Sequence, residues 1–248
     1  MAFDDGPDSF PRLRNVGVAG MLVSFGESLS EPANRAALAF RAELEREGWA
    51  GVEETSTSLV SAFLRFDPVH LGHDALRERL EVLLATRDWY EAPLPSGRRL
   101  WRIPAVFGTE LAPQLGDAAA AAGLSEAEAI ASLTETRVRV QTIGFAPGQP
   151  YLGSLPEAWD IPRQSALTSQ IPEGALAVAI RQLVLFSVST PTGWQHVGQT
   201  AVRLFRPEAE EPFLLRPGDE VEFTRTDAEG LEALRRDPRG GAEERPLP

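Results

Sequence analysis

The chain has 248 residues and a formal net charge of −12, and all 24 of its basic residues are arginine. It contains no cysteine, which excludes disulfides, thiolate metal sites and cysteine nucleophiles and fits a reducing cytoplasm. The absence of lysine excludes Schiff-base catalysis and a Walker A loop, and the acidity disfavours nucleic acid and anionic membranes as partners. No apolar run approaches the roughly 20 residues of a membrane span, and no signal-peptide core follows Met1. We therefore expect a cytoplasmic protein.

The first half of the chain has the pattern of a small α+β domain of split βαβ character. A buried strand is expected over residues 16–25, followed by a helix in which Ser30 is the N-cap and Gly48 ends the last turn. One or two strands are expected over residues 52–66. A second helix with one leucine-rich face is expected over about residues 74–86.

The second half is mainly β in character. Residues 101–107 predict a strand. Pro104 within it indicates that this strand lies at the edge of a sheet or contains a bulge. Residues 111–122 predict an alanine-rich helix, and Ser125 with Glu128 three positions later forms a capping box that begins another. Six short apolar segments separated by turn signals then favour a barrel or a sandwich; they span residues 137–143, 176–179, 183–188, 194–197, 201–205 and 220–225.

These patterns predict two domains, as the length also favours. Residues 1–15 are expected to be a loose lead-in and residues 16–87 the α+β domain. A stretch rich in proline and glycine over residues 88–99 is interpreted as a linker. The β domain is expected over residues 100–227, and the charged residues 228–248 are expected to be a disordered tail.

The stretch over residues 143–156 holds three glycines and three prolines around an apolar group, Phe145, Tyr151 and Leu152. Pro147 and Pro150 remove backbone donors, so neither a helix nor a central strand is expected to continue through it. Gly148 and Gly153 can adopt positive φ, which suits tight turns or close approach to a ligand. The stretch is either the rim of a binding site or a structural corner whose aromatic rings fill the core.

Two constellations of polar residues are weak candidates for chemistry. His70, His73 and Asp74 could offer metal ligands, but a fourth ligand is not evident, and no metal site is expected. His196 and Ser154 could belong to a catalytic triad. The sequence around Ser154 lacks the second glycine of a nucleophile elbow, so this interpretation is disfavoured.

Arg163 is a stronger candidate, because a guanidinium can hold a carboxylate or phosphate through two parallel hydrogen bonds. The alternative is a surface arginine whose stem packs on Trp159. Function is favoured because several polar and aromatic residues lie in segments that could converge with it: Gln182, Trp194, Gln199 and Thr200.

Five segments in order resemble the allophanate hydrolase subunit 1 family, which includes the B subunit of bacterial 5-oxoprolinase and the KipI inhibitor of a sporulation histidine kinase. They are GFAPGQPYLGSLP at 144–156, PR at 162–163, PEG at 172–174, PTGWQHVGQT at 191–200 and LRPGD at 215–219. With weaker similarity in the N-terminal half, the resemblance covers about residues 15–226.

The resemblance implies a small α/β domain followed by a cyclophilin-like β-barrel. It also implies action beside a subunit-2-like partner, of the type of the 5-oxoprolinase C subunit, with a protein of the type of the A subunit as a further partner. The implied reaction is ATP-dependent cleavage of 5-oxoproline to glutamate, with ATP bound at the level of the complex. Arg163 and Gln182 are the implied catalytic residues, and backbone donors near Gly144 to Gly153 are expected to steady an oxyanion. The implied substrate-binding residues are Gly144, Phe145, Pro147, Gly148, Tyr151, Leu152, Gly153, Trp194 and Thr200.

The chain departs from the family pattern mainly at polar or turn-forming positions. Gln149 replaces a phenylalanine, Leu133 a histidine and Gln199 an arginine, and a second Pro-Arg pair after Arg163 is absent. The fold-bearing glycines and prolines are kept, so the pattern predicts the scaffold more firmly than the catalysis. Two alternatives stay open: a KipI-like regulatory module that binds a histidine kinase, and half of a biotin-dependent urea or amide carboxyltransferase.

Overall fold

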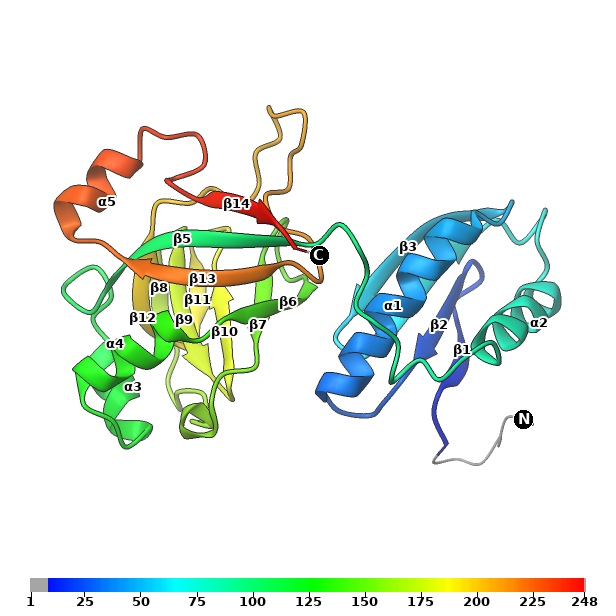
Figure 1. The fold of residues 1–248 in the computed structure, drawn as a ribbon, viewed down its shortest axis with the longest axis horizontal. Coiled ribbons are helices and arrows are strands. Elements are labelled where there is room, and N and C mark those ends of the chain that lie inside the picture. Colours follow the sequence, from blue (N-terminus) through cyan, green and yellow to red (C-terminus); the bar gives the residue numbers. More distant parts are fainter. Residues whose placement is uncertain (1–8, 248) are drawn as a thin grey trace. The chain divides into compact units, whose positions relative to one another are not determined.

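A computed structural model describes residues 9–247 of the chain. Its contacts divide into two compact units, Met1–Ser96 and Gly97–Pro248. The division falls inside the 88–99 segment interpreted as a linker. Each unit is described by itself below and is drawn in Figure 1.

The first unit is an antiparallel four-stranded sheet in the order β1-β2-β4-β3, with α1 packed against β3 and β4. Since β4 lies between β2 and β3, the β2-α1-β3 segment is a split βαβ unit, which confirms the expected class. The elements are β1 (Arg12–Val16), β2 (Gly20–Ser24), α1 (Glu31–Glu47), β3 (Val52–Ser58), β4 (Ser61–Phe66) and α2 (His73–Leu84).

Local chemistry sets the ends of α1 as the sequence predicts. The Ser30 side chain accepts a hydrogen bond from the Ala33 N–H at 3.3 Å, and Gly48 has a φ of 58° while its N–H donates to the Leu44 carbonyl. The single strand expected over residues 16–25 is wrong. The segment instead belongs to a hairpin that turns at Gly17. Its first strand, β1, includes residues of the expected lead-in and pairs with β2. The rest of that lead-in, residues 1–8, lies outside the described residues.

The second unit is a closed barrel of seven strands in the order β12-β9-β10-β7-β6-β13-β5, closed by pairing of β12 with β5. This confirms the mainly-β barrel. Its elements are β5 (Arg99–Phe107), α3 (Leu115–Ala121), α4 (Glu126–Glu135), β6 (Val138–Ile143), β7 (Pro150–Gly153), the short 3-10 helix η1 (Glu157–Trp159), β8 (Thr168–Ile171), β9 (Ala175–Ala179), β10 (Gln182–Leu185), β11 (Thr190–Thr192), β12 (Gln195–Thr200), β13 (Glu220–Arg225), α5 (Ala228–Leu234) and β14 (Glu243–Pro246).

The strands of the barrel separate two apolar layers because successive side chains point to opposite faces. Leu152, Leu183 and Val178 belong to the main core inside the barrel. Their neighbours on the outer face belong to a second, smaller cluster that the β8–β11 segment covers, with Ala177 and Val184 buried and Tyr151 packed against it. The outer face of β7, β10 and β9 is therefore apolar, and any site built there lies outside the barrel core.

The expected disordered tail at 228–248 is wrong for residues 228–246. Asp227 caps α5 through a 2.8 Å bond from the Gly230 N–H, Leu231 is buried, and β14 pairs with β5 (Figure 1). These long-range contacts could not be predicted from the charged composition of the segment. The strand expected over residues 201–205 does not form, and only an isolated bridge joins Phe205 to Phe213.

Two proline-based expectations also need correction. Pro104 lies within the barrel sheet, at the point where β5 exchanges β14 for β12 as its neighbour, so no partner among the described residues faces it on that side. Pro150 begins β7, which runs between β6 and β10 as a central strand. Proline is tolerated as the first residue of a strand. The expectation that no strand passes through 143–156 is therefore wrong.

Candidate functional site

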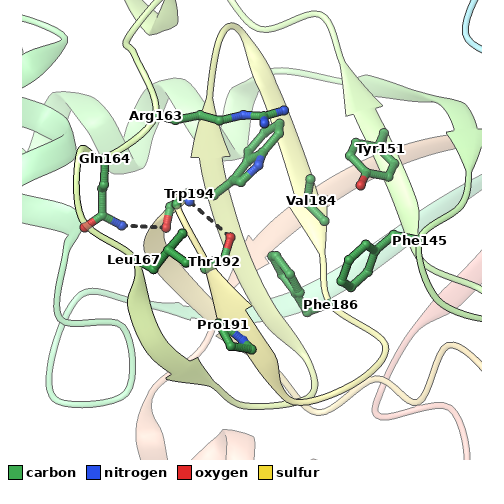
Figure 2. Close-up of a pocket in the computed structure, with 11 residues that line it drawn as sticks. Phe145, Tyr151, Arg163, Gln164, Leu167, Val184, Phe186, Pro191, Thr192 and Trp194 are labelled. Atoms are coloured by element: carbon green, nitrogen blue, oxygen red, sulfur yellow. Dashed lines mark hydrogen bonds between the residues drawn. The ribbon is translucent and has the colours of Figure 1, made fainter.

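A pocket of about 310 Å³ lies on the outer face of the barrel (Figure 2). Strands β7 and β10 provide part of its wall, and the segments around Arg163 and Trp194 provide the opposite side. Its lining is mostly apolar and aromatic with a few polar groups, as is typical of small-molecule sites. The lining residues are Phe145, Tyr151, Arg163, Gln164, Leu167, Val184, Phe186, Pro191, Thr192, Gly193 and Trp194.

Strand register places the floor of the pocket. Tyr151 on β7 faces Val184 on β10, and Val184 faces Ala177 on β9, so one row of outward side chains crosses three strands. The small side chain of Ala177 leaves room above this row. The rings of Tyr151 and Trp194 meet edge to face, with centroids 6.2 Å apart.

Arg163 is the charged group of the pocket. Its guanidinium carbon lies 5.2 Å from the centroid of the Trp194 ring, a cation–π geometry. Trp159, the alternative partner, is fully buried, and its indole N–H donates to the Ser132 hydroxyl. The Arg163 side chain is exposed, and within the described residues it forms no ion pair. Its guanidinium donors therefore face no carboxylate of residues 9–247 and can take a ligand.

Gln164 fastens the Arg163 segment to the Trp194 segment. Its backbone N–H donates to the Gly193 carbonyl at 2.7 Å, and its side-chain amide donates to the Trp194 carbonyl at 2.8 Å. Gln114 in turn donates to the Gln164 side-chain oxygen at 2.8 Å and accepts from the His196 N–H at 2.7 Å. This chain of amides links the loop before α3 to β12 and to the pocket.

Phe145 stands at the mouth of the pocket in an unusual conformation. Its φ is 73°, in the left-handed region that non-glycine residues rarely adopt, and the residue is 73% exposed. The turn beyond it requires Gly148, whose φ is 72° and where an added Cβ would lie 2.9 Å from the Leu204 carbonyl oxygen. The loop is therefore both a structural corner and part of the pocket rim.

The pocket gathers four of the residues predicted from the sequence, Phe145, Tyr151, Arg163 and Trp194. It leaves out Gln182, whose buried amide donates to the Gln141 side-chain oxygen at 2.8 Å. Thr200 is also absent from the pocket lining, and its buried hydroxyl donates to the Gly174 carbonyl. The remaining predicted residues shape the fold beside the pocket: Gly144, Pro147, Gly148, Leu152 and Gly153.

Two of those fold-shaping roles are specific. The Gly144 N–H donates to the Gln149 carbonyl at 3.0 Å, so this donor is already engaged and does not face an oxyanion. An added Cβ at Gly153 would lie 2.6 Å from the Gln141 side-chain oxygen, which explains the glycine by close approach. Gln149 is itself buried, and its side-chain oxygen accepts from the Ser187 N–H at 3.4 Å. The replacement of the family's phenylalanine by Gln149 therefore concerns the packing between loops.

The other candidates do not assemble into sites. Ser154 follows β7 and His196 lies on β12, and β9 and β10 lie between those strands, three spacings of about 4.8 Å each. His70 pairs with the Asp67 carboxylate, and the His73 ring packs edge to face on Phe66. Among residues 9–247 no group of three potential metal-ligating side chains comes together.

Sequence reasoning missed the part of the pocket formed by Gln164, Leu167 and Phe186. Gln164 directly follows the recognised Pro-Arg pair, which is the signal that could have found it. Leu167 and Phe186 carry no such signal. Leu167 directly precedes β8, whose pairing with β11 places its segment, and Phe186 directly follows β10.

A split βαβ unit followed in the sequence by a closed seven-stranded barrel is a cyclophilin-like barrel architecture. Residues 11–215 match the family described as carboxyltransferase domain, subdomain C and D. The chain belongs to this family.

Relatives and solved structures agree with that assignment. The chain is 32% identical over 225 residues to the B subunit of 5-oxoprolinase from Bacillus subtilis strain 168, which covers 86% of this chain and 92% of the relative. It is 39% identical over 165 residues to the B subunit of 5-oxoprolinase from Escherichia coli O157:H7, covering 66% of this chain and 72% of that protein.

The crystal structure of TTHA0988 has a TM-score of 0.70 at 32% identity, over 87% of this chain and 40% of that one. The chain thus spans about two fifths of that protein. The Kluyveromyces lactis urea carboxylase shares the fold, with a TM-score of 0.68 at 19% identity over 97% of this chain and 25% of that chain. In the part of this chain that the structure describes, no helix is both long and apolar enough to cross a bilayer.

Proposed function

We propose that this chain is the B-type component of an ATP-dependent 5-oxoprolinase that opens 5-oxoproline to glutamate. It acts with a subunit-2-like partner of the 5-oxoprolinase C type and with a protein of the A type. The support is the similarity to proteins named as B subunits of 5-oxoprolinase over most of the chain. The observation that carries the proposal is the Arg163 guanidinium, which has no ion pair within residues 9–247 and lies on the wall of an aromatic pocket.

In this proposal Arg163 holds the carboxylate of 5-oxoproline through its planar fork of donors. The Trp194 ring beneath the guanidinium fixes its plane, and the aromatic walls exclude water from the lactam. The chain has no Walker A loop, so ATP binds through the partner proteins. The chain's own part is to bind and orient the acid.

Coexpression of the full chain with A-type and C-type partners tests this proposal. The expected result is ATP-dependent release of glutamate from 5-oxoproline that requires all three proteins. Activity no greater than that of the partners alone would contradict it. Omitting ATP and omitting this chain are the two matched controls.

The family description favours one second candidate, half of a biotin-dependent carboxyltransferase. That candidate requires a biotinylated partner, so avidin would block the activity of the complex. An avidin-insensitive, ATP-dependent glutamate release supports the first proposal over the second.

A further inference from the structure

The pocket has two chemically different ends. Arg163 lies over Trp194 at one end, while Phe145 and Phe186 lie together at the other (Figure 2). Between them, Tyr151 points its hydroxyl toward the cavity above Val184 (Figure 2). A ligand that fills both ends therefore needs an anionic head and an apolar body.

The polar groups of the pocket suit one anionic head. Within residues 9–247 Arg163 forms no ion pair, and the Tyr151 hydroxyl has no hydrogen-bond partner. The Gln164 amide donates to the Trp194 carbonyl and the Thr192 hydroxyl accepts from the Trp194 backbone N–H, so both are committed to the frame. Arg163 therefore keeps charged donors for an anionic head, and the Tyr151 hydroxyl keeps a neutral donor for a further polar contact.

The volume of the pocket is larger than the volume of the smallest acid of this kind. Its volume of about 310 Å³ lies within the range of roughly 300–1,000 Å³ that sites for drug-sized ligands occupy. A five-membered lactam with one carboxyl group is much smaller than that class of ligand. A lactam held at the Arg163 end leaves the Phe145 end unfilled.

The Phe145 end carries two further signs that it binds a ligand. Phe145 is held at a φ of 73° and Leu167 opposite it in the lining is 70% exposed, so two large apolar side chains face water. The exposed apolar surface of the two side chains costs free energy relative to burial. An apolar ligand body that covers Phe145 and Leu167 would recover it.

We propose that the pocket selects carboxylates with a flat apolar body, with the carboxylate on Arg163 and Tyr151 and the body between Phe145, Leu167 and Phe186. The inference rests on the proposed function only in using Arg163 as the carboxylate anchor, and it assigns a further class of ligand to that same pocket. The proposed selectivity concerns binding to this chain alone, so it can fail while the complex still hydrolyses 5-oxoproline.

Calorimetric titration of the full chain tests the proposal with four acids of increasing apolar body, 5-oxoproline, benzoate, phenylacetate and indole-3-acetate. The dissociation constant is expected to fall at least tenfold from the first to the last. Phenylacetamide, which has the same body without the charge, is expected to bind at least tenfold more weakly than phenylacetate.

Two variants separate the two ends of the pocket. Phe145→Ala is expected to remove the preference for indole-3-acetate over 5-oxoproline, and Arg163→Gln is expected to weaken all four acids. Arg225→Gln, at an exposed arginine at the end of β13 outside the lining, is the charge control. Circular dichroism checks that each variant folds.

Equal affinity for all four acids, or equal affinity for phenylacetate and its amide, would overturn the proposal. So would the absence of any acid binding below millimolar concentration in the folded wild-type chain. Failure of glutamate release by the assembled complex, with acid binding intact, would instead overturn the proposed function and leave this inference standing.

Discussion

The guanidinium carbon of Arg163 lies 5.2 Å from the centroid of the Trp194 ring, and Gln164, which joins their two segments, holds both in place. The Trp194 backbone N–H and carbonyl are each hydrogen-bonded, to Thr192 and Gln164. The backbone that carries the indole is therefore held at two points. A guanidinium that lies over an aromatic ring still has donors for a carboxylate.

Replacing Arg163 by lysine tests whether the planar fork matters. A lysine keeps the charge but offers no bidentate geometry, so Arg163→Lys is expected to raise the KM for 5-oxoproline about tenfold in the assembled complex, with a smaller change in kcat. Steady-state kinetics measures both constants, with Arg225→Lys as the matched control. An unchanged KM would show that Arg163 does not hold the substrate.

Replacing Gln164 by alanine tests the amide chain behind the pocket. Gln164→Ala removes the bond to the Trp194 carbonyl and one of the two acceptors of the Gln114 amide, which keeps the Thr168 hydroxyl, so the barrel is expected to lose about 1–3 kcal/mol. Acrylamide quenching of tryptophan fluorescence should increase as the Trp194 platform loosens. Gln170→Ala, at an exposed glutamine bonded to the Ser189 hydroxyl, is the control. Equal effects of the two substitutions would contradict a positioning role for Gln164.

The parts of the fold that local chemistry decides could be predicted from the sequence. Ser30 and Gly48 bound α1, and Ser125 and Glu128 form the capping box of α4. Each of these features depends on residues within a few positions of one another. For the same reason their prediction needs no knowledge of the fold.

The parts that failed depend on distant pairing. Pro150 argued against a strand, yet β7 forms because β6 and β10 lie on both sides of it. The charged residues 243–246 form β14 only because β5 offers an edge there. At the pocket, Arg163 and Trp194 carry recognisable chemistry, but Phe186 and Leu167 are ordinary apolar residues whose place follows from sheet register alone.

Removing the buried carboxylate of Asp219 is expected to destabilise the barrel strongly. Asp219 is 2% exposed and accepts hydrogen bonds from the Arg99 guanidinium at 2.7 Å and the Trp101 indole N–H at 3.2 Å. Asp219→Ala removes the nearer of the two carboxylates that pair with Arg99, since Glu244 stays at 3.4 Å, and leaves the buried Trp101 indole N–H without its acceptor, which typically costs about 1–3 kcal/mol. Urea unfolding of the full chain measures the loss. Asp160→Ala, at an exposed aspartate, should change stability by no more than about 0.5 kcal/mol, and a similar loss in both variants would contradict the assignment.

The stability of the barrel is expected to fall in acid partly through His196. This residue is 4% exposed, and burial lowers its pKa, opposed by contacts with the Gly198 backbone and the Gln199 side chain. Because the folded pKa is depressed, the unfolded chain binds the proton more strongly, and stability falls as pH drops below the unfolded value of about 6.5. One proton gives a slope of at most about 1.4 kcal/mol per pH unit, which ends once the folded protein also takes up the proton. Urea unfolding at a series of pH values should show this loss in the wild type and in His70→Gln, which leaves His196 in place. The slope should flatten in His196→Gln, and an identical slope in all three proteins would exclude His196 as its source.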